Sequence, residues 1–291
     1  MVLSGGGERR RAHRGQWRAY PPEDGRAHTV AGSVRVMERF WSPQLGNQRD
    51  LLVYLPPSYA RGRRRYPVVY MHDGQNLFDQ ATSFGEEWQV DETMEAAAAG
   101  GVEAIVVGIP NMGDARLDEY SPWHDAESGG GGRADAYLDL LLETIKPVVD
   151  RDFRTLPGRE HTAVAGSSMG GLVSLYAYFR RPDAFGAAGV MSPALWFAGG
   201  QVFPFVEQAP FVPGRLYLDI GTNEGKTALE DARRMRDLLE AKGYRRGEDF
   251  LYVTALGGRH SERAWRRRTR RMMHFLLGIA PPAVEPPRRA G

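Results

Sequence analysis

The sequence GSSMGG at residues 166–171 follows a short apolar stretch and precedes a longer one. The residues before it, TAVA at 162–165, have the apolar and partly β-branched character of a buried strand. The residues after it, LVSLYAYF at 172–179, are apolar enough to begin a buried helix. A serine between glycines at a strand-to-helix turn is either a reactive nucleophile or part of an ordinary tight turn. Which of these two interpretations holds depends on residues elsewhere in the chain.

The composition is that of a globular protein large enough to bury a sizeable core. The chain has 291 residues, of which 42% are hydrophobic and 25% are charged. No run approaches 18 apolar residues, so we expect no membrane span. The first residues are basic and lack the apolar segment typical of an export signal, which makes the cytoplasm the expected location. The absence of cysteine excludes disulfides, thiolate metal ligands and a cysteine nucleophile.

Arginine is concentrated in three clusters, at residues 9–14, 61–65 and 263–271. The formal net charge is only +2, so the clusters are local, and we expect them to be solvated loops and one helix face. No nucleic-acid motif or aromatic platform accompanies them, and we therefore predict no nucleic-acid partner. The sequence makes no prediction about the oligomeric state.

The two ends of the chain differ in composition from its middle. Residues 1–28 are rich in Gly, Arg and Pro and have little periodicity, so we predict a flexible N-terminal arm. Residues 280–291 have the same character and form the predicted Pro- and Arg-rich tail. Residues 29–279 contain no long linker and no internal repeat, which predicts a single domain.

The middle of the chain alternates short apolar runs with helical patterns. Strand-like runs occur at residues 33–40, 49–55, 66–71, 104–109, 162–165, 187–191, 215–220 and 249–256. Helical patterns occur at residues 88–98, 134–149, 172–179, 229–242 and 261–277. This alternation predicts an α/β fold with a mostly parallel central sheet and helices on both faces. The first two strands are close in sequence, which predicts an antiparallel N-terminal edge.

The pattern Gly-x-Ser-x-Gly is the nucleophile elbow of the α/β-hydrolase fold when a strand precedes it and a helix follows. Ser168 fits the pattern, with Gly166 and Gly170 two residues away on either side. Ser167 does not fit, because the residues two positions from it are Ala165 and Met169. A chain of this composition contains the pattern by chance about once in five cases, so the position between a strand and a helix carries the argument.

A reactive serine needs a base to accept its proton, and the base needs a carboxylate to orient it. In this fold the three groups follow one another in the order Ser, acid, His. Only His260 and His274 follow Ser168. His274 lies in a helical run, where we expect it to pack or to face solvent. His260 lies in a glycine loop between a strand and a helix, so it is the predicted base.

The acid is expected in or after the strand at residues 215–220. The sequence RLYLDIGTNEG offers Glu224 in the loop and Asp219 inside the strand. Loop placement favours Glu224, and Asp219 is the alternative if the strand ends early. The competing interpretation is that either carboxylate only caps the helix that begins near residue 227.

The oxyanion of an acyl-transfer reaction needs hydrogen-bond donors. The backbone N–H of Met169, at the start of its helix, is one predicted donor. The second is expected in the loop after an early strand, where HDGQN at 72–76 places the N–H groups of Gly74 and Gln75. The alternative is a simple strand-to-helix turn in which His72 is a packed residue and Asp73 is a helix cap.

Several stretches together resemble the "putative esterase" family of α/β-hydrolases. They are MHDGQNLFD at 71–79, GSSMGG at 166–171, SPALWF at 192–197, DIGTNEG at 219–225 and GGRHSERAWRRR at 257–268. The family includes enterochelin esterases, feruloyl and acetyl-xylan esterases, S-formylglutathione hydrolases and mycolyltransferases. The HDGQN form is similar to its siderophore-esterase branch. The resemblance implies an α/β-hydrolase fold with Ser168 as nucleophile, His260 as base and Glu224 as acid.

Loops expected at the carboxyl ends of the strands offer candidate substrate-binding residues. Trp123 and Trp196 are candidates for lining an acyl or aromatic pocket, with core packing as the alternative. Arg116 is a candidate for holding an anionic substrate, with a surface salt bridge as the alternative. Asp73 is a further candidate, and Arg263 lies close in sequence to the predicted base. No cluster has metal-binding spacing, and a hydrolase of this type needs neither metal nor cofactor.

These features predict a serine carboxylic-ester hydrolase that acts on a small-molecule ester through an acyl-enzyme. Siderophore-type and aryl esters are the candidate substrates. An acyltransferase would use the same three residues and pass the acyl group to an alcohol other than water. A non-catalytic binding protein on the same fold is the third alternative, although it would have no need to keep the three residues in this order.

Overall fold

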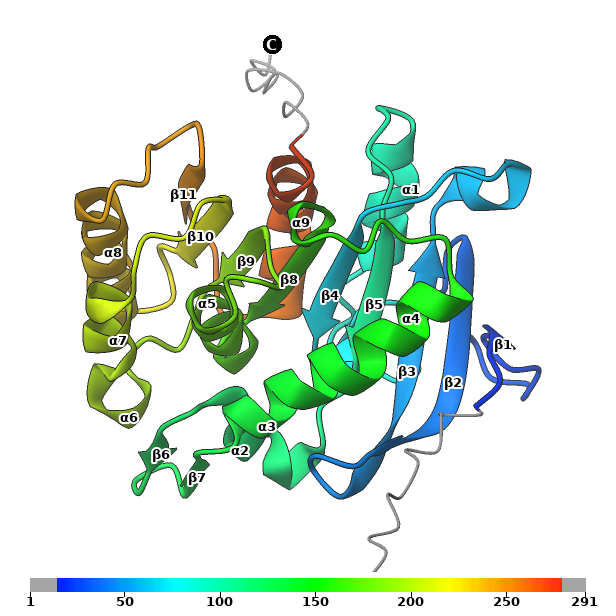
Figure 1. Cartoon of the computed structure of the whole chain (residues 1–291), viewed down its shortest axis with the longest axis horizontal. Coiled ribbons are helices and arrows are strands. Elements are labelled where there is room, and N and C mark those ends of the chain that lie inside the picture. The colour runs from blue at the N-terminus through cyan, green and yellow to red at the C-terminus, as the bar shows by residue number, and fades with distance from the viewer. Residues whose placement is uncertain (1–14, 279–291) are drawn as a thin grey trace, which may run out of the picture.

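A mostly parallel sheet forms the centre of the computed structural model, which describes residues 15–278 (Figure 1). Its nine strands lie in the order β1-β2-β3-β5-β4-β8-β9-β10-β11. The strands are β1 (Arg18–Tyr20), β2 (Ser33–Ser42), β3 (Asn47–Leu55), β4 (Val68–His72), β5 (Ile105–Ile109), β8 (Thr162–Ser167), β9 (Ala187–Met191), β10 (Arg215–Gly221) and β11 (Phe250–Ala255). A separate hairpin pairs the short strands β6 (His124–Asp125) and β7 (Gly130–Gly131).

The strand directions confirm the predicted α/β fold. The strands β5, β4, β8, β9, β10 and β11 run parallel to one another. The strands β2 and β3 pair antiparallel, and β3 pairs antiparallel with β5, as predicted for the N-terminal edge. Because parallel strands share one direction, the carboxyl ends of six strands meet at a single edge of the sheet, where ligands bind in folds of this kind.

The N-terminal segment extends the sheet further than the sequence indicates. Strand β1 pairs antiparallel with β2, although its residues belong to the predicted arm. The hydroxyl of Tyr20 donates to Asp79, and His28 Nδ1 lies 2.6 Å from the same carboxylate. Residues 15–28 are therefore attached to the sheet edge and to the loop after β4. The rest of the predicted arm, residues 1–14, and the predicted tail, residues 280–291, lie outside the described residues.

Helices cover both faces of the sheet (Figure 1). The helices are α1 (Val90–Ala98), α2 (Arg116–Tyr120), α3 (Ala134–Asp139), α4 (Lys146–Asp152), α5 (Met169–Arg180), α6 (Phe197–Gly200), α7 (Val202–Gln208), α8 (Lys226–Ala241) and α9 (Glu262–Leu276). One apolar cluster joins α3, α4, α5, α7 and α8 to one face, and a second joins α1 and α9 to the other. Within residues 15–278, no helix has the length and apolar character that crossing a bilayer requires.

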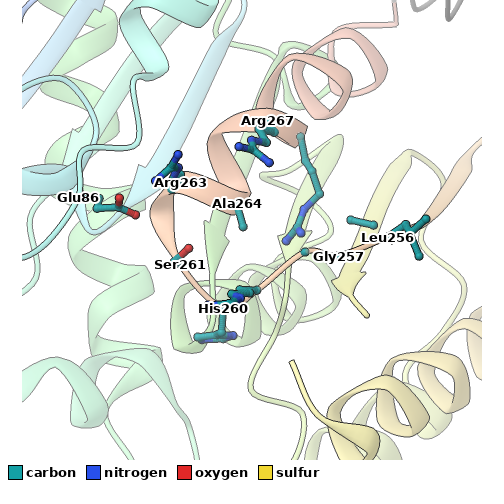
Figure 2. Close-up of a pocket in the computed structure, with 12 residues that line it drawn as sticks. Glu86, Leu256, Gly257, His260, Ser261, Arg263, Ala264 and Arg267 are labelled. Atoms are coloured by element: carbon teal, nitrogen blue, oxygen red, sulfur yellow. The ribbon is translucent and has the colours of Figure 1, made fainter. Parts of the chain in front are cut away.

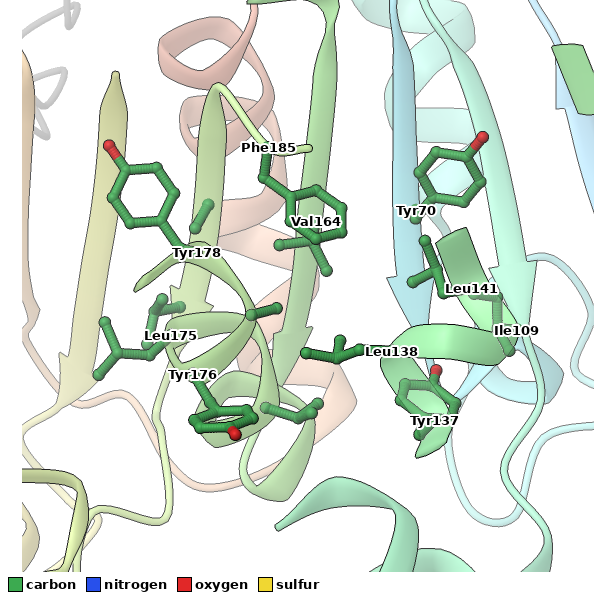
Figure 3. Packing of buried hydrophobic residues seen from close by; sticks show 14 of the residues in the cluster. Tyr70, Ile109, Tyr137, Leu138, Leu141, Val164, Leu175, Tyr176, Tyr178 and Phe185 are labelled. Carbon is green, nitrogen blue, oxygen red and sulfur yellow. The ribbon is translucent and has the colours of Figure 1, made fainter. Parts of the chain in front are cut away.

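The helix predicted over residues 134–149 is found as α3 and α4 joined by a π-helical segment, Leu140–Ile145. Figure 3 shows how this helical segment and α5 pack against β4, β5 and β8. The side chains in this layer include Tyr70, Ile109, Tyr137, Leu138, Leu141, Val164, Leu175, Tyr176 and Tyr178. Full burial of one such leucine contributes about 1.5–3 kcal/mol, so this layer holds α5 firmly against β8.

Several short elements lie in regions that are predicted as loops. Helix α2 follows β5, and α6 and α7 follow β9. The hairpin of β6 and β7 lies between α2 and α3. All of them follow the carboxyl ends of parallel strands, so they build the edge where the predicted site residues lie.

Replacing Gly166 with alanine is expected to destabilise the fold. A Cβ at this position would lie 2.8 Å from the backbone carbonyl carbon and oxygen of Gly170. Strand β8 and helix α5 would have to separate, which costs roughly 1–3 kcal/mol. Chemical denaturation of the wild-type and Gly166→Ala proteins measures this difference.

Gly62→Ala is the control for this experiment. A Cβ at Gly62 would meet nothing within 4 Å, and its φ of −167° is ordinary extended backbone. The control should stay within about 0.5 kcal/mol of the wild type. A Gly166→Ala protein as stable as the control would contradict the close approach of β8 and α5.

Candidate active site

Ser168 lies at the turn between β8 and α5 and has a strained backbone. Its φ of 57° and ψ of −122° are rare for a residue with a side chain. Its N–H donates to the carbonyl of Met191, and its carbonyl accepts from the N–H groups of Leu172 and Ala194 at 3.0 and 3.1 Å. These bonds tie the turn to the end of β9 and to the first turn of α5. Ser167, by contrast, is the buried last residue of β8.

His260 and Glu224 form a hydrogen-bonded pair at the same edge of the sheet. Glu224 follows β10 and His260 follows β11, and His260 Nδ1 lies 2.8 Å from Glu224 Oε2. Since an ionised carboxylate only accepts, Nδ1 carries the proton and Nε2 is left as an acceptor. The side chain of His260 is 46% exposed, whereas that of Glu224 is 1% exposed. The carboxylate is thus buried beneath an accessible imidazole.

Three donors hold the Glu224 carboxylate in its ionised form. Its Oε1 accepts from the N–H of Gly221 and from the hydroxyl of Ser192, each at 2.7 Å, and its Oε2 accepts from His260. Burial alone would raise the pKa of Glu224, but these hydrogen bonds outweigh burial and lower the pKa below its ordinary value. Glu224 is therefore charged at neutral pH and able to stabilise an imidazolium.

Asp219, the alternative acid, shares Ser192 and Arg268 with Glu224 but makes no contact with His260. It is fully buried in β10, where its Oδ1 accepts from the N–H of Ser192 and its Oδ2 accepts from the hydroxyl of Tyr217. The guanidinium Nε of Arg268 lies 2.9 Å from Oδ2. Burial raises the pKa of Asp219 to about 6, against the opposing effect of Arg268. The structure thus brings Glu224, and not Asp219, to His260.

Arg268 differs from the expectation of a solvated arginine face on the last helix. It is 6% exposed, and its Nη2 donates to the hydroxyl of Ser192 at 2.8 Å. The reason is the helical period, which turns this position of α9 toward β10 while its neighbours face outward. Within the arginine cluster at 263–271, the expectation is wrong for this residue.

Ser192 joins the groups beneath the His–Glu pair, and it is not among the residues predicted from the sequence. Its hydroxyl donates to Glu224 and accepts from Trp265 Nε1 at 2.9 Å. It follows Met191, the residue whose carbonyl binds the Ser168 N–H. Ser192 therefore connects the serine turn with Glu224. The stretch SPALWF begins with it, but no local pattern distinguishes this serine from an ordinary turn serine.

The two predicted oxyanion segments lie next to each other. Met169 is the first residue of α5, where backbone N–H groups lack an acceptor within the helix. Gly74 and Gln75 lie in a 3₁₀ turn after β4, and Gln75 Oε1 accepts from the N–H of Asn111. A Cβ on Gly170 would come within 3.2 Å of His72 Cβ, so this turn is packed against the start of α5.

Asp73 and Arg116, both predicted to bind substrate, form an ion pair with each other. Arg116 Nε and Nη2 donate to the two oxygens of Asp73 at 2.7 and 2.8 Å, and Asn111 Nδ2 also donates to Asp73. Burial alone would lower the pKa of Arg116, but the hydrogen bond to Asp73 raises it above its ordinary value. The pair connects the turn after β4 with α2, so it holds in place the turn that contains Gly74 and Gln75.

His72 is buried beneath the same turn. Its Nδ1 lies 2.8 Å from the hydroxyl of Tyr137, and its ring packs between Tyr120 and Tyr137. Burial lowers its pKa to about 3, so it is neutral. His274 is buried within α9. Among His72, His260 and His274, His260 is the one that lies at the sheet edge with a carboxylate partner.

A cavity of about 610 Å³ lies beside His260 (Figure 2). It is formed by the loop after β11 and the first turns of α9, with Glu86 on the opposite wall. Arg263 and Arg267 line it together with His260. A negatively charged group would therefore be attracted to this cavity.

A second cavity, of about 720 Å³, brings together Trp123 and Trp196. Trp123 contacts Tyr176 and Phe205, with ring centroids 5.7 Å apart in each case. Trp196 is 56% exposed and lies two residues after Ala194, which binds the Ser168 carbonyl. The indoles thus line one opening near the serine turn, with Trp123 also packed in the core.

The family model described as "Putative esterase" matches residues 42–276 of the chain. The chain belongs to this family. Membership confirms the predicted family and assigns the chain to the ester-hydrolysing enzymes. The match spans the serine turn and the loops that carry Glu224 and His260.

Two curated relatives of the esterase carry named activities. A siderophore triacetylfusarinine C esterase of Aspergillus fumigatus is 36% identical over 146 residues, which are 47% of this chain and 47% of that protein. An endo-1,4-beta-xylanase/feruloyl esterase of Xylanibacter ruminicola is 26% identical over 245 residues, which are 82% of this chain and 30% of that protein. The match thus spans less than half the length of each relative.

A solved structure supports the fold of the esterase. The BES protein from Bacillus cereus superposes with a TM-score of 0.68 at 19% identity, covering 85% of this chain and 95% of that one. At this identity the likeness concerns the α/β-hydrolase fold alone.

Substitutions of the two carboxylates are expected to have different effects. Glu224→Gln should lower kcat roughly 10²–10⁴-fold with little change in stability, because it removes the charge that orients His260. Asp219→Asn should cost about 1.5–3 kcal/mol of stability, because it removes the nearer of the two carboxylates that face the buried Arg268 and leaves only Glu224, at 3.7 Å. Ester hydrolysis assays and chemical denaturation of both variants measure the two effects. The reverse pattern, with activity lost mainly in Asp219→Asn, would assign the acid to Asp219.

Proposed function

We propose that the chain is a serine carboxylic-ester hydrolase with Ser168 as nucleophile, His260 as base and Glu224 as acid. The observation that carries the proposal is the 2.8 Å contact between His260 Nδ1 and the buried, ionised Glu224. This contact leaves His260 Nε2 as a proton acceptor at the sheet edge where Ser168 follows β8. The strained turn at Ser168 supports a reactive role for its side chain.

In the proposed reaction, Ser168 Oγ attacks the ester carbonyl carbon while its proton passes to His260 Nε2. The resulting imidazolium is stabilised by Glu224, which accepts the Nδ1 proton in a hydrogen bond. The tetrahedral intermediate collapses, and the leaving alcohol takes the proton from His260. Water then attacks the acyl-enzyme carbonyl while His260 accepts its proton. The bond to Ser168 Oγ breaks, His260 returns the proton to Oγ, and the carboxylic acid is released. Water is the proposed acceptor, and transfer to another alcohol is the alternative outcome.

The backbone N–H groups of Met169 and of the Gly74–Gln75 turn are the proposed oxyanion donors. The N-terminus of α5 adds the favourable end of the helix dipole. The ion pair of Asp73 and Arg116 helps to hold this arrangement, because it fixes the turn whose N–H groups would face the oxyanion. Removal of one such donor in a hydrolase of this class typically costs about 10²–10³ in kcat.

The proposed substrate is an ester that carries a negative charge or an aromatic ring, as in siderophore-type or aryl esters. Arg263 and Arg267 beside His260 favour an anionic group, and the indoles of Trp123 and Trp196 favour an aromatic one. The relatives named above include a siderophore esterase and a feruloyl esterase. The cytoplasmic location stays a prediction.

Ser168→Ala is expected to abolish hydrolysis of short p-nitrophenyl esters and to keep the fold. The loss of the nucleophile should reduce kcat by about 10⁴-fold or more. Ser167→Ala is the matched control, because it removes the neighbouring hydroxyl and should retain most activity. Steady-state kinetics measures the loss, and circular dichroism checks that both variants are folded. Comparable activity in Ser168→Ala and wild type would refute the proposed nucleophile.

Arg263→Gln is expected to raise KM more for a carboxylated ester than for a neutral ester of the same alcohol. Loss of a charge-assisted contact should give roughly a tenfold difference between the two substrates. Arg266→Gln serves as the control, because Arg266 belongs to the same helix and is outside the residues lining the cavity. Equal KM changes for both esters in the Arg263 variant would show that this cavity does not select anionic substrates.

A further inference from the structure

Three carboxylates gather at the start of α1, outside the residues assigned to catalysis. Glu87, Asp91 and Glu92 each offer a carboxylate oxygen, and these oxygens lie within 4.8 Å of one another. Glu87 is 3% exposed and Asp91 is 0% exposed. In sequence, Glu87 precedes the helix and the other two lie in its first turn, which explains why spacing alone does not reveal the cluster.

One oxygen of each carboxylate is buried and makes no hydrogen bond to any of the described residues. These oxygens are Glu87 Oε1, Asp91 Oδ1 and Glu92 Oε2. The other oxygens of Glu87 and Asp91 accept hydrogen bonds from the N-terminal segment. Thr29 Oγ1 donates to Glu87 Oε2 at 2.9 Å, and the Ala31 N–H donates to Asp91 Oδ2 at 2.6 Å. No ion pair within residues 15–278 involves any of the three carboxylates. Each of the three clustered carboxylates thus keeps one buried oxygen that accepts from no donor of the described residues.

The cluster cannot hold three negative charges at this depth without a positive partner. Without an ion pair, carboxyl groups buried this closely together either keep protons or bind a cation. Two carboxyls that share a proton are the alternative to a metal ion.

We propose that Glu87, Asp91 and Glu92 bind a divalent cation and that Ca²⁺ suits the cluster best. Three carboxylates are hard oxygen ligands, which Ca²⁺ and Mg²⁺ prefer. Ca²⁺ binds oxygens at about 2.3–2.6 Å, so two oxygens on opposite sides of one ion are separated by up to about 5 Å. Mg²⁺ binds at about 2.0–2.1 Å and demands a tighter, more regular arrangement.

The bound cation would stabilise the segment that leads from the oxyanion turn to α1. The N–H of Trp88 donates to the carbonyl of Asn76, at the end of that turn, and the N–H of Val90 donates to the carbonyl of Leu77. Thr29 and Ala31 connect the same carboxylates to the N-terminal segment. The site is thus structural, and it does not depend on the proposed catalytic function.

Terbium luminescence tests the proposal, because Tb³⁺ replaces Ca²⁺ and is excited by a nearby tryptophan. Trp88 is buried and adjacent in sequence to Glu87. The full chain, treated with EDTA and dialysed, should show saturable sensitised emission with Tb³⁺ that Ca²⁺ displaces. Its unfolding temperature should also rise with added Ca²⁺. Asp91→Asn should weaken Ca²⁺ binding at least tenfold.

Glu95→Gln is the matched control, since Glu95 lies one turn further along α1 and accepts from the hydroxyl of Tyr54. This variant should bind Tb³⁺ and Ca²⁺ like the wild type. If Asp91→Asn does not fold, Glu92→Gln, at the less buried ligand, gives the same comparison. The proposal is overturned if the wild type shows neither sensitised emission nor a Ca²⁺-dependent rise in unfolding temperature. It is also overturned if the ligand variants bind as tightly as Glu95→Gln, which would place the ion elsewhere.

Discussion

The close approach of β8 and α5 at Ser168 is the constraint on which the site depends. The chain turns from strand to helix within one residue, at a positive φ that a serine adopts only when its surroundings enforce it. Gly166 and Gly170 allow this, because a Cβ at Gly166 would lie 2.8 Å from the backbone of Gly170. The bond from the Ser168 N–H to Met191 then ties the turn to the neighbouring strand.

The parallel sheet explains how residues far apart in sequence come to one place. Ser168, Glu224 and His260 follow β8, β10 and β11, whose carboxyl ends share one edge. A second layer of contacts sets their relative positions. The Ser192 hydroxyl binds Glu224 and accepts from Arg268, which in turn faces Asp219. Arg268 thus lies between two carboxylates, with its Nε 2.9 Å from Asp219 Oδ2 and its Nη2 3.7 Å from Glu224 Oε1.

The sequence predicts the parts of the site that have local signals. The serine turn, the glycine loop of His260 and most strands are recognisable because pattern and position agree. The choice between Glu224 and Asp219 has a weaker signal, because loop placement favours Glu224 but depends on where the strand ends, and the strand ends at Gly221, between the two residues. The pairing of β1 with β2 and the burial of Arg268 also depend on contacts between distant segments. The carboxylate cluster at α1 likewise has no spacing signal, because Glu87 precedes the helix and its burial depends on the fold around it.

Covalent labelling tests the central claim, that Ser168 is the nucleophile, most directly. A fluorophosphonate transfers its phosphonyl group to an activated serine, with fluoride as the leaving group, and inhibits hydrolysis as it does so. Digestion and tandem mass spectrometry then locate the added mass within residues 166–171. The account predicts one adduct, on Ser168, that forms in step with the loss of esterase activity. An adduct on Ser167, or complete inhibition without any adduct in this peptide, would contradict it.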